Sequence, residues 1–87
     1  MVVFVKPKGT CSQCDLTKRR LDAAGLEYAE RDLVTDPTAL EFVKTLGYLS
    51  APVVVVRDAD GLTRHWAGFR PDLIDELTNT VRKAAAA

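Results

Sequence analysis

The residues of this chain best suited to covalent chemistry are its two cysteines, Cys11 and Cys14, which are separated by Ser12 and Gln13. A free thiol is a weak nucleophile at neutral pH and becomes reactive where its surroundings favour the thiolate. Two cysteines this close in sequence can also form and release a disulfide with each other. The spacing therefore indicates thiol–disulfide exchange.

The neighbouring segments predict how these cysteines are positioned. Residues 2–5 form an apolar, β-branched run of strand length, and from Asp15 the chain is charged and helix-favouring until Ala23-Ala24-Gly25, which puts Cys11 at or just before the first helical turn. The unpaired N–H groups and positive dipole end of that helix would face the Cys11 sulfur, and Lys6 or Lys8 would add positive charge. We therefore expect Cys11 to be the nucleophile and Cys14, one turn later, to be the more buried, resolving cysteine.

Other uses of two cysteines fit the sequence less well. A closed zinc site normally takes four ligands, whereas the chain offers two cysteines and one distant histidine, His65. A structural disulfide across so short a loop would stabilise little, and two inert buried cysteines would not require this spacing. The pattern favours a redox dithiol without a bound metal or other cofactor.

Length and composition limit the remaining possibilities. The 87 residues, 47% of them hydrophobic, predict a single domain over residues 1–87 with a small core. Twelve basic and twelve acidic residues balance, so no overall field favours nucleic acid or an acidic membrane. No apolar run approaches the length of a membrane span, and the N-terminus shows no secretion signal. We expect a cytoplasmic monomer.

The rest of the chain reads as alternating helices and strands. A half-exposed strand is predicted over residues 26–33, a continuously apolar strand covered on both faces over 53–56, and an antiparallel return over 62–66 after a turn at 58–61. Helices are predicted from Asp36-Pro37 to Gly47 and from Pro71 into an alanine tail, residues 84–87, that should fray. The first carries an apolar stripe of Leu40, Phe42, Val43 and Leu46, and the second has Leu73, Ile74, Leu77 and Val81 on one face. The order β-α-β-α-β-β-α predicts an α/β fold, a four-stranded mixed sheet with three helices on its two faces.

This arrangement resembles the thioredoxin fold in its glutaredoxin-sized form, and the resemblance covers nearly the whole chain. Within that superfamily the sequence is most similar to the NrdH-redoxin family. The similarity lies in Cys-Ser-Gln-Cys at 11–14, Ser-Ala-Pro-Val at 50–53 and, most specifically, Trp-Ala-Gly-Phe-Arg-Pro-Asp at 66–72. Two residues depart from the family pattern: Ser12, where valine is more usual, and Ala67, where serine is more usual.

The resemblance implies an electron carrier that is reduced by thioredoxin reductase, with electrons from NADPH, and that reduces class Ib ribonucleotide reductase. It also implies that Pro52 is a cis-proline facing the dithiol, although sequence alone also allows a proline that merely begins a strand. The residues expected to contact partners surround the dithiol: Lys6, Thr10, Ser12, Gln13, Ala51, Pro52, Val53, Trp66, Gly68, Phe69, Arg70 and Asp72.

Some side chains of the last motif can be read in two ways. Trp66 is either a core residue or a contact residue, whereas Phe69, in a loop beside Gly68, has little reason to be buried and would form a docking surface. Arg70 could pair with Asp72 and hold the loop, or Asp72 could support the start of the third helix through the helix dipole.

The stretch after Gly68 lacks the acidic feature with which glutaredoxins capture glutathione, so we expect weak glutathione binding. Two alternatives to the electron carrier stay open: a glutathione-dependent glutaredoxin, and a non-catalytic adaptor that binds peptides beside Pro52.

Overall fold

The chain forms four strands and three helices in the predicted order. The structure is a computed structural model, and it describes residues 1–7, 9–57, 61 and 63–86. The strands are β1 (Val2–Val5), β2 (Ala29–Asp32), β3 (Val53–Arg57) and β4 (Thr63–Ala67). The helices are α1 (Ser12–Ala23), α2 (Pro37–Thr45) and α3 (Pro71–Ala86).

The strands form one mixed sheet in the order β2-β1-β3-β4. β1 pairs in parallel with β2 and antiparallel with β3, and β3 pairs antiparallel with β4. The parallel first crossover and the antiparallel last pair agree with the sequence prediction. The turn predicted at 58–61 lies largely outside the described residues, and of these four only Gly61 is described.

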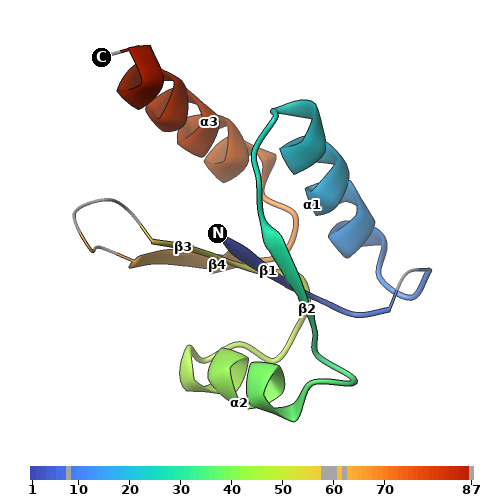
Figure 1. Ribbon diagram of the computed structural model, residues 1–87. Coiled ribbons are helices and arrows are strands. Elements are labelled where there is room, and N and C mark those ends of the chain that lie inside the picture. Colours follow the sequence, from blue (N-terminus) through green and yellow to red (C-terminus); the bar gives the residue numbers. More distant parts are fainter. Residues whose placement is uncertain (8, 58–60, 62, 87) are drawn as a thin grey trace.

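Helices cover both faces of the sheet: α1 and α3 lie on one face and α2 on the other (Figure 1). Because side chains alternate along a strand, neighbouring residues enter different cores. Val3 and Val54 join the cluster under α1 and α3, while Phe4 and Val53 join the cluster under α2. Both faces of β3 are thus packed, as its continuously apolar sequence predicts.

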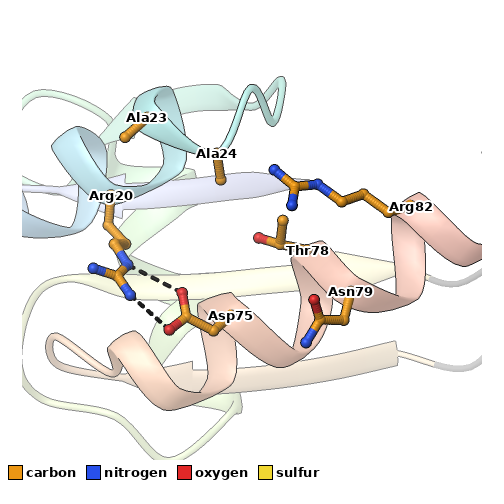
Figure 2. Close-up of a pocket in the computed structure, with 7 residues that line it drawn as sticks. All are labelled: Arg20, Ala23, Ala24, Asp75, Thr78, Asn79 and Arg82. Atoms are coloured by element: carbon orange, nitrogen blue, oxygen red, sulfur yellow. Dashed lines mark hydrogen bonds and ion pairs between the residues drawn. The ribbon is translucent and has the colours of Figure 1, made fainter.

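The larger cluster joins α1 and α3 to the sheet. It includes Leu21 from α1, Ile74 from α3 and Trp66 from β4, all less than 10% exposed. At the outer edge of this pair, the guanidinium of Arg20 donates two hydrogen bonds to Asp75, at 3.0 and 2.6 Å (Figure 2). The two helices that flank the dithiol are therefore fixed to each other by both apolar and ionic contacts.

The smaller cluster shows that α2 covers its face less completely than its sequence predicts. Asp36 caps the helix and Pro37 is its first residue, as expected. The buried side chains are Ala39 and Val43, whereas Leu40 and Phe42 are 38% and 41% exposed. The apolar stripe predicted from the sequence is therefore only partly buried, because a helix of nine residues presents one narrow face to the sheet, although the ring of Phe42 lies 5.5 Å from that of Phe4.

Other differences from the predicted elements occur at their ends. β2 begins at Ala29, three residues later than predicted, and β3 and β4 each extend one residue further. Val81 is 44% exposed, so the buried stripe of α3 ends before it. Helix α3 continues to Ala86, the fraying expected over residues 84–87 stays a prediction, and Ala87 lies outside the described residues. Within the described ranges, no helix combines the length and apolarity that a bilayer span requires.

Candidate active site

Cys11 is the N-cap of α1, as predicted. Its backbone is extended, with φ −144° and ψ 98°, and its carbonyl accepts the first helical hydrogen bond, from the N–H of Asp15. Its Sγ accepts a hydrogen bond from the Cys14 N–H at 3.2 Å. An N-cap side chain satisfies donors that the helix itself leaves unpaired. A Cys11 thiolate in this position would receive the same N–H and the positive end of the helix dipole.

The two cysteines differ in burial and are joined by a disulfide. Cys14 is 1% exposed and belongs to the larger cluster, whereas Cys11 is half-buried at its edge. Their Cα atoms are 5.2 Å apart. A partner molecule can therefore approach Cys11, whereas the group that reaches the buried Cys14 is Cys11, its disulfide partner.

A tight turn brings the chain from β1 to Cys11. The N–H and the hydroxyl of Thr10 both donate to the carbonyl of Pro7, at 3.1 and 2.5 Å. Thr10 thus holds the approach to the cysteine through its own backbone and side chain. Lys6 is exposed beside this turn, and Lys8 lies outside the described residues.

The peptide bond between Ala51 and Pro52 is cis, which confirms the expectation drawn from the family resemblance. Pro52 is fully buried, and its carbonyl accepts a hydrogen bond from the Gly68 N–H at 2.8 Å. Ala51 packs against both clusters, including the one that contains Cys14. The Ala51–Pro52 segment therefore joins the dithiol to the rest of the sheet.

Gln13 connects the helix of the dithiol to the loop after β4. Its side-chain Oε1 accepts a hydrogen bond from the Phe69 N–H at 3.0 Å. Gly68 has a φ of +83°, and a Cβ at that position would lie 3.2 Å from Gln13 Oε1. Glycine meets both conditions, because it tolerates positive φ and leaves room for the amide oxygen. The sequence places Gln13 and Gly68 at the site but does not indicate this bridge.

The charged residues of the same loop satisfy each other. Arg70 donates to both carboxylate oxygens of Asp72, at 3.1 and 2.9 Å. These hydrogen bonds hold the pKa of Asp72 below its ordinary value and raise the pKa of Arg70. The pairing proposed from the sequence is thus present.

Three of the expected contact residues, Pro52, Val53 and Trp66, are buried, and a fourth, Phe69, is partly buried. Val53 and Trp66 are 0% and 7% exposed, and Trp66 Nε1 is buried without a hydrogen-bond partner among the described residues. Phe69 is half-buried against the larger cluster, so it is less exposed than the sequence predicts, and its role in docking stays a prediction. The backbone hydrogen bonds of Gly68 and Phe69 hold the loop against the core, and the Phe69 side chain packs on the larger cluster.

Thiol chemistry is the chemistry that the site can perform with its own groups. Among the residues that the structure describes, no group of three or more His, Cys, Asp and Glu side chains is placed to hold a metal ion. Ser12 and Gln13 are exposed between the cysteines. The Gly68–Phe69 segment links to Gln13 through the Phe69 N–H and to the Ala51–Pro52 segment through the Gly68 N–H.

Comparison with known proteins agrees with this description. The family model for glutaredoxin matches residues 1–59. The "Glutaredoxin-like protein NrdH" of Salmonella typhimurium is 31% identical over 86 residues, which is 99% of this chain and 100% of the relative. The protein of the same name from Escherichia coli K12 is 30% identical over the same shares. The "Gene 56 protein" of Mycobacterium phage L5 is 32% identical over 78 residues, 88% of this chain and 70% of that protein.

Solved structures give the same result for the fold. The NrdH-redoxin of Escherichia coli superposes with a TM-score of 0.72 at 31% identity, covering 88% of this chain and 95% of that one. Chloroplastic thioredoxin z superposes with a TM-score of 0.66 at 21% identity, covering 94% and 76%, and this likeness concerns the fold alone. Fold and site together define a thioredoxin-fold thiol–disulfide oxidoreductase. The chain belongs to the glutaredoxin family, among its glutaredoxin-like NrdH-redoxins.

Proposed function

We propose that the protein is a dithiol electron carrier in which Cys11 attacks substrate disulfides and Cys14 resolves the intermediate. The observation that carries this assignment is the difference between the two sulfurs: Cys11 is an accessible N-cap residue, and Cys14 is 1% exposed beneath it. A nucleophile must be reached by the substrate, and a resolving thiol must be reached only by its neighbour.

The proposed reaction transfers two electrons to the substrate. The Cys11 thiolate attacks one sulfur of the substrate disulfide, that disulfide breaks, and the departing thiolate takes a proton from solvent. Cys14, after losing its proton, then attacks Cys11 Sγ and displaces the second substrate thiol. The substrate leaves as a dithiol, and the protein is left with the Cys11–Cys14 disulfide.

We propose that thioredoxin reductase, using NADPH, reduces this disulfide. Glutathione is the weaker candidate because Arg70 and Asp72 already satisfy each other and leave no free carboxylate in this loop for the amino group of the tripeptide. The E. coli NrdH-redoxin is described as having a thioredoxin-like activity profile, which supports the same choice.

The remaining parts of the proposal rest on the family resemblance. Class Ib ribonucleotide reductase is the proposed electron acceptor, and the proposed setting is a cytoplasmic, monomeric domain of residues 1–87. Partner contacts would be made by the accessible groups around Cys11: Lys6, Thr10, Ser12, Gln13, Ala51, Gly68, Phe69, Arg70 and Asp72. Pro52, Val53 and Trp66, which are buried, would support these groups from below.

A coupled assay tests the proposal. The oxidised protein is offered NADPH with thioredoxin reductase in one cuvette, and NADPH with glutathione and glutathione reductase in another. We expect rapid NADPH consumption only in the first, followed by reduction of an added protein disulfide. Comparable turnover in both would identify a glutathione-dependent glutaredoxin. Turnover in neither, with partner binding that survives Cys11→Ser, would identify the adaptor.

A further inference from the structure

An apolar groove lies on the α2 side of the sheet and has no part in the chemistry described above. We call it the α2 groove and define it by Lys6, Leu33, Val34, Leu40, Lys44 and Leu49, which line a cavity of about 200 Å³. Leu33 and Val43, at 8% and 2% exposure, form its buried floor. It combines three segments: the start of the loop after β1, the β2–α2 connection, and α2 with the loop after it.

The rim of the groove leaves apolar surface in contact with solvent. Leu49 is 92% exposed, Val34 67% and Leu40 38%. Single exposed apolar residues are ordinary, but these three line one concavity. An apolar side chain that entered the groove would remove both its own surface and theirs from water.

The groove continues toward the dithiol through the cis-proline segment. Ser50, which also lines it, directly precedes Ala51–Pro52, and Lys6 directly follows β1 on the way to Cys11. Ala51 packs against both the cluster that contains Cys14 and the cluster that forms the groove floor. An extended chain bonded to Cys11 and passing Ala51 would therefore reach the groove within a few residues.

The charges of the groove are positive. Lys6 makes no ion pair with any residue that the structure describes, and Lys44 has only a loose pair with Glu41, at 4.0 Å. No acidic side chain lines the cavity within the described residues. A carboxylate beside the apolar side chain of a ligand would thus meet complementary charge.

We propose that the α2 groove selects protein substrates by binding a large aliphatic or aromatic side chain close in sequence to their reactive cysteine, with an acidic residue beside it. This inference rests on the proposed function. The volume favours one side chain over a free small molecule, since small-molecule pockets usually start at about 300 Å³. The groove would add substrate preference to a dithiol that by itself reacts with any accessible disulfide.

Short peptides with a single cysteine test the preference. The cysteine is joined to thionitrobenzoate, a good leaving group, so that Cys11 attacks the peptide sulfur and the release of thionitrobenzoate reports the rate. Each peptide carries leucine or alanine at one position near the cysteine, before or after it. The residue beside that leucine or alanine is glutamate or lysine. We expect the best leucine–glutamate peptide to react about tenfold faster than its alanine–glutamate counterpart. Its leucine–lysine counterpart should react several-fold more slowly, with a difference that shrinks at high salt.

Variants locate the effect. Leu49→Ser and Val34→Ser should bring the leucine-to-alanine rate ratio close to one, and Lys44→Glu should reverse the glutamate preference. Val81→Ser, which removes an apolar residue 44% exposed on α3, is the matched control and should keep the wild-type ratio. Each comparison is a ratio within one protein, so a general change in thiol reactivity cancels.

Three results would overturn the inference. If every peptide reacts rapidly at one common rate, the groove does not select substrates, although the proposed carrier function stands. If no peptide reacts, the carrier function itself fails. If Leu49→Ser instead converts a dimer to a monomer in sedimentation experiments, a second copy of the chain occupies the groove and the substrate does not.

Discussion

The face of the sheet under α1 and α3 and the face under α2 are built from alternate residues of the same strands, yet helices cover them to different extents. The first is covered by helices of 12 and 16 residues that also bind each other through Arg20 and Asp75. The second is covered by one helix of nine residues, which leaves Leu40 and Phe42 partly in solvent.

Because the two faces are covered to different extents, one can serve the thiol reaction and the other the recognition of substrates. Thiol exchange needs two sulfurs held in fixed positions, and on the well-covered face Cys14 belongs to a cluster of buried side chains from β1, β3, β4, α1 and α3. Recognition of a protein needs apolar surface that is still free, and the poorly covered face retains it. A small domain can thus combine a rigid reactive centre with an open binding surface by covering one side of its sheet more fully than the other.

The strongest test of this separation changes the reactive sulfurs. Cys11→Ser should reduce turnover with thioredoxin reductase and NADPH to the uncatalysed background, because the accessible nucleophile is lost. Cys14→Ser should still attack, and should accumulate a mixed disulfide visible by mass spectrometry, because the resolving thiol is lost. Turnover that survives in Cys11→Ser would transfer the nucleophilic role to Cys14.

The next test compares stability on the two faces. Ile74→Ala, in the larger cluster, should lower the free energy of unfolding by about 2–5 kcal/mol, because Ile74 is fully buried. Leu40→Ala, on α2, should change it by roughly 0.5 kcal/mol, because its side chain is already 38% exposed. Urea denaturation measures both, and equal losses would mean that the two faces are packed alike.

A pair of glycines sharpens the comparison. Gly68 and Gly47 have φ values of +83° and +89°, so alanine at either should cost roughly 1–2 kcal/mol in denaturation experiments. Only at Gly68 would the new Cβ meet a side chain, Gln13 Oε1 at 3.2 Å, whereas at Gly47 nothing lies within 4 Å.

Gly68→Ala should therefore also slow turnover per folded molecule, and Gly47→Ala, its control on the α2 side, should not. Addition of Gln13→Ala to Gly68→Ala removes that contact but not the backbone cost. If Gly68→Ala leaves turnover at the wild-type value, the bridge from α1 to this loop does not position the dithiol.

The smallest expected effect is a pH dependence on the α2 side. Hydrogen bonds from Thr38, Arg31 and the Ala39 N–H lower the pKa of Asp36 from 3.8 to about 2. Because the folded pKa lies below the unfolded one, this stabilisation is present above pH about 4 and is lost as the pH falls toward 2. Solvent exposure keeps it modest. Asp36→Asn should flatten the pH dependence of the melting temperature between these pH values. If the curves of the variant and the wild type remain parallel, Asp36 does not cause the acid destabilisation.

The sequence by itself determined the features that depend on short-range structure. Cys11 at the start of a helix, Pro37 after its capping Asp36, and a strand at residues 53–56 follow from the preferences of neighbouring residues, and the structure contains all three. The placement of Cys14 one helical turn after Cys11 also follows, and the packing of the larger cluster then buries Cys14 to 1% exposure.

Only the tertiary structure decided how far each surface is covered. A stripe of apolar residues on α2 looks buried in the sequence, but Leu40 and Phe42 stay 38% and 41% exposed, although the ring of Phe42 lies 5.5 Å from that of Phe4. Phe69 is half-buried where its N–H donates to Gln13, 56 residues earlier, and Arg20 meets Asp75 across 55 residues. Such contacts join segments that carry no local signal for each other, because their energy appears only after the chain has folded.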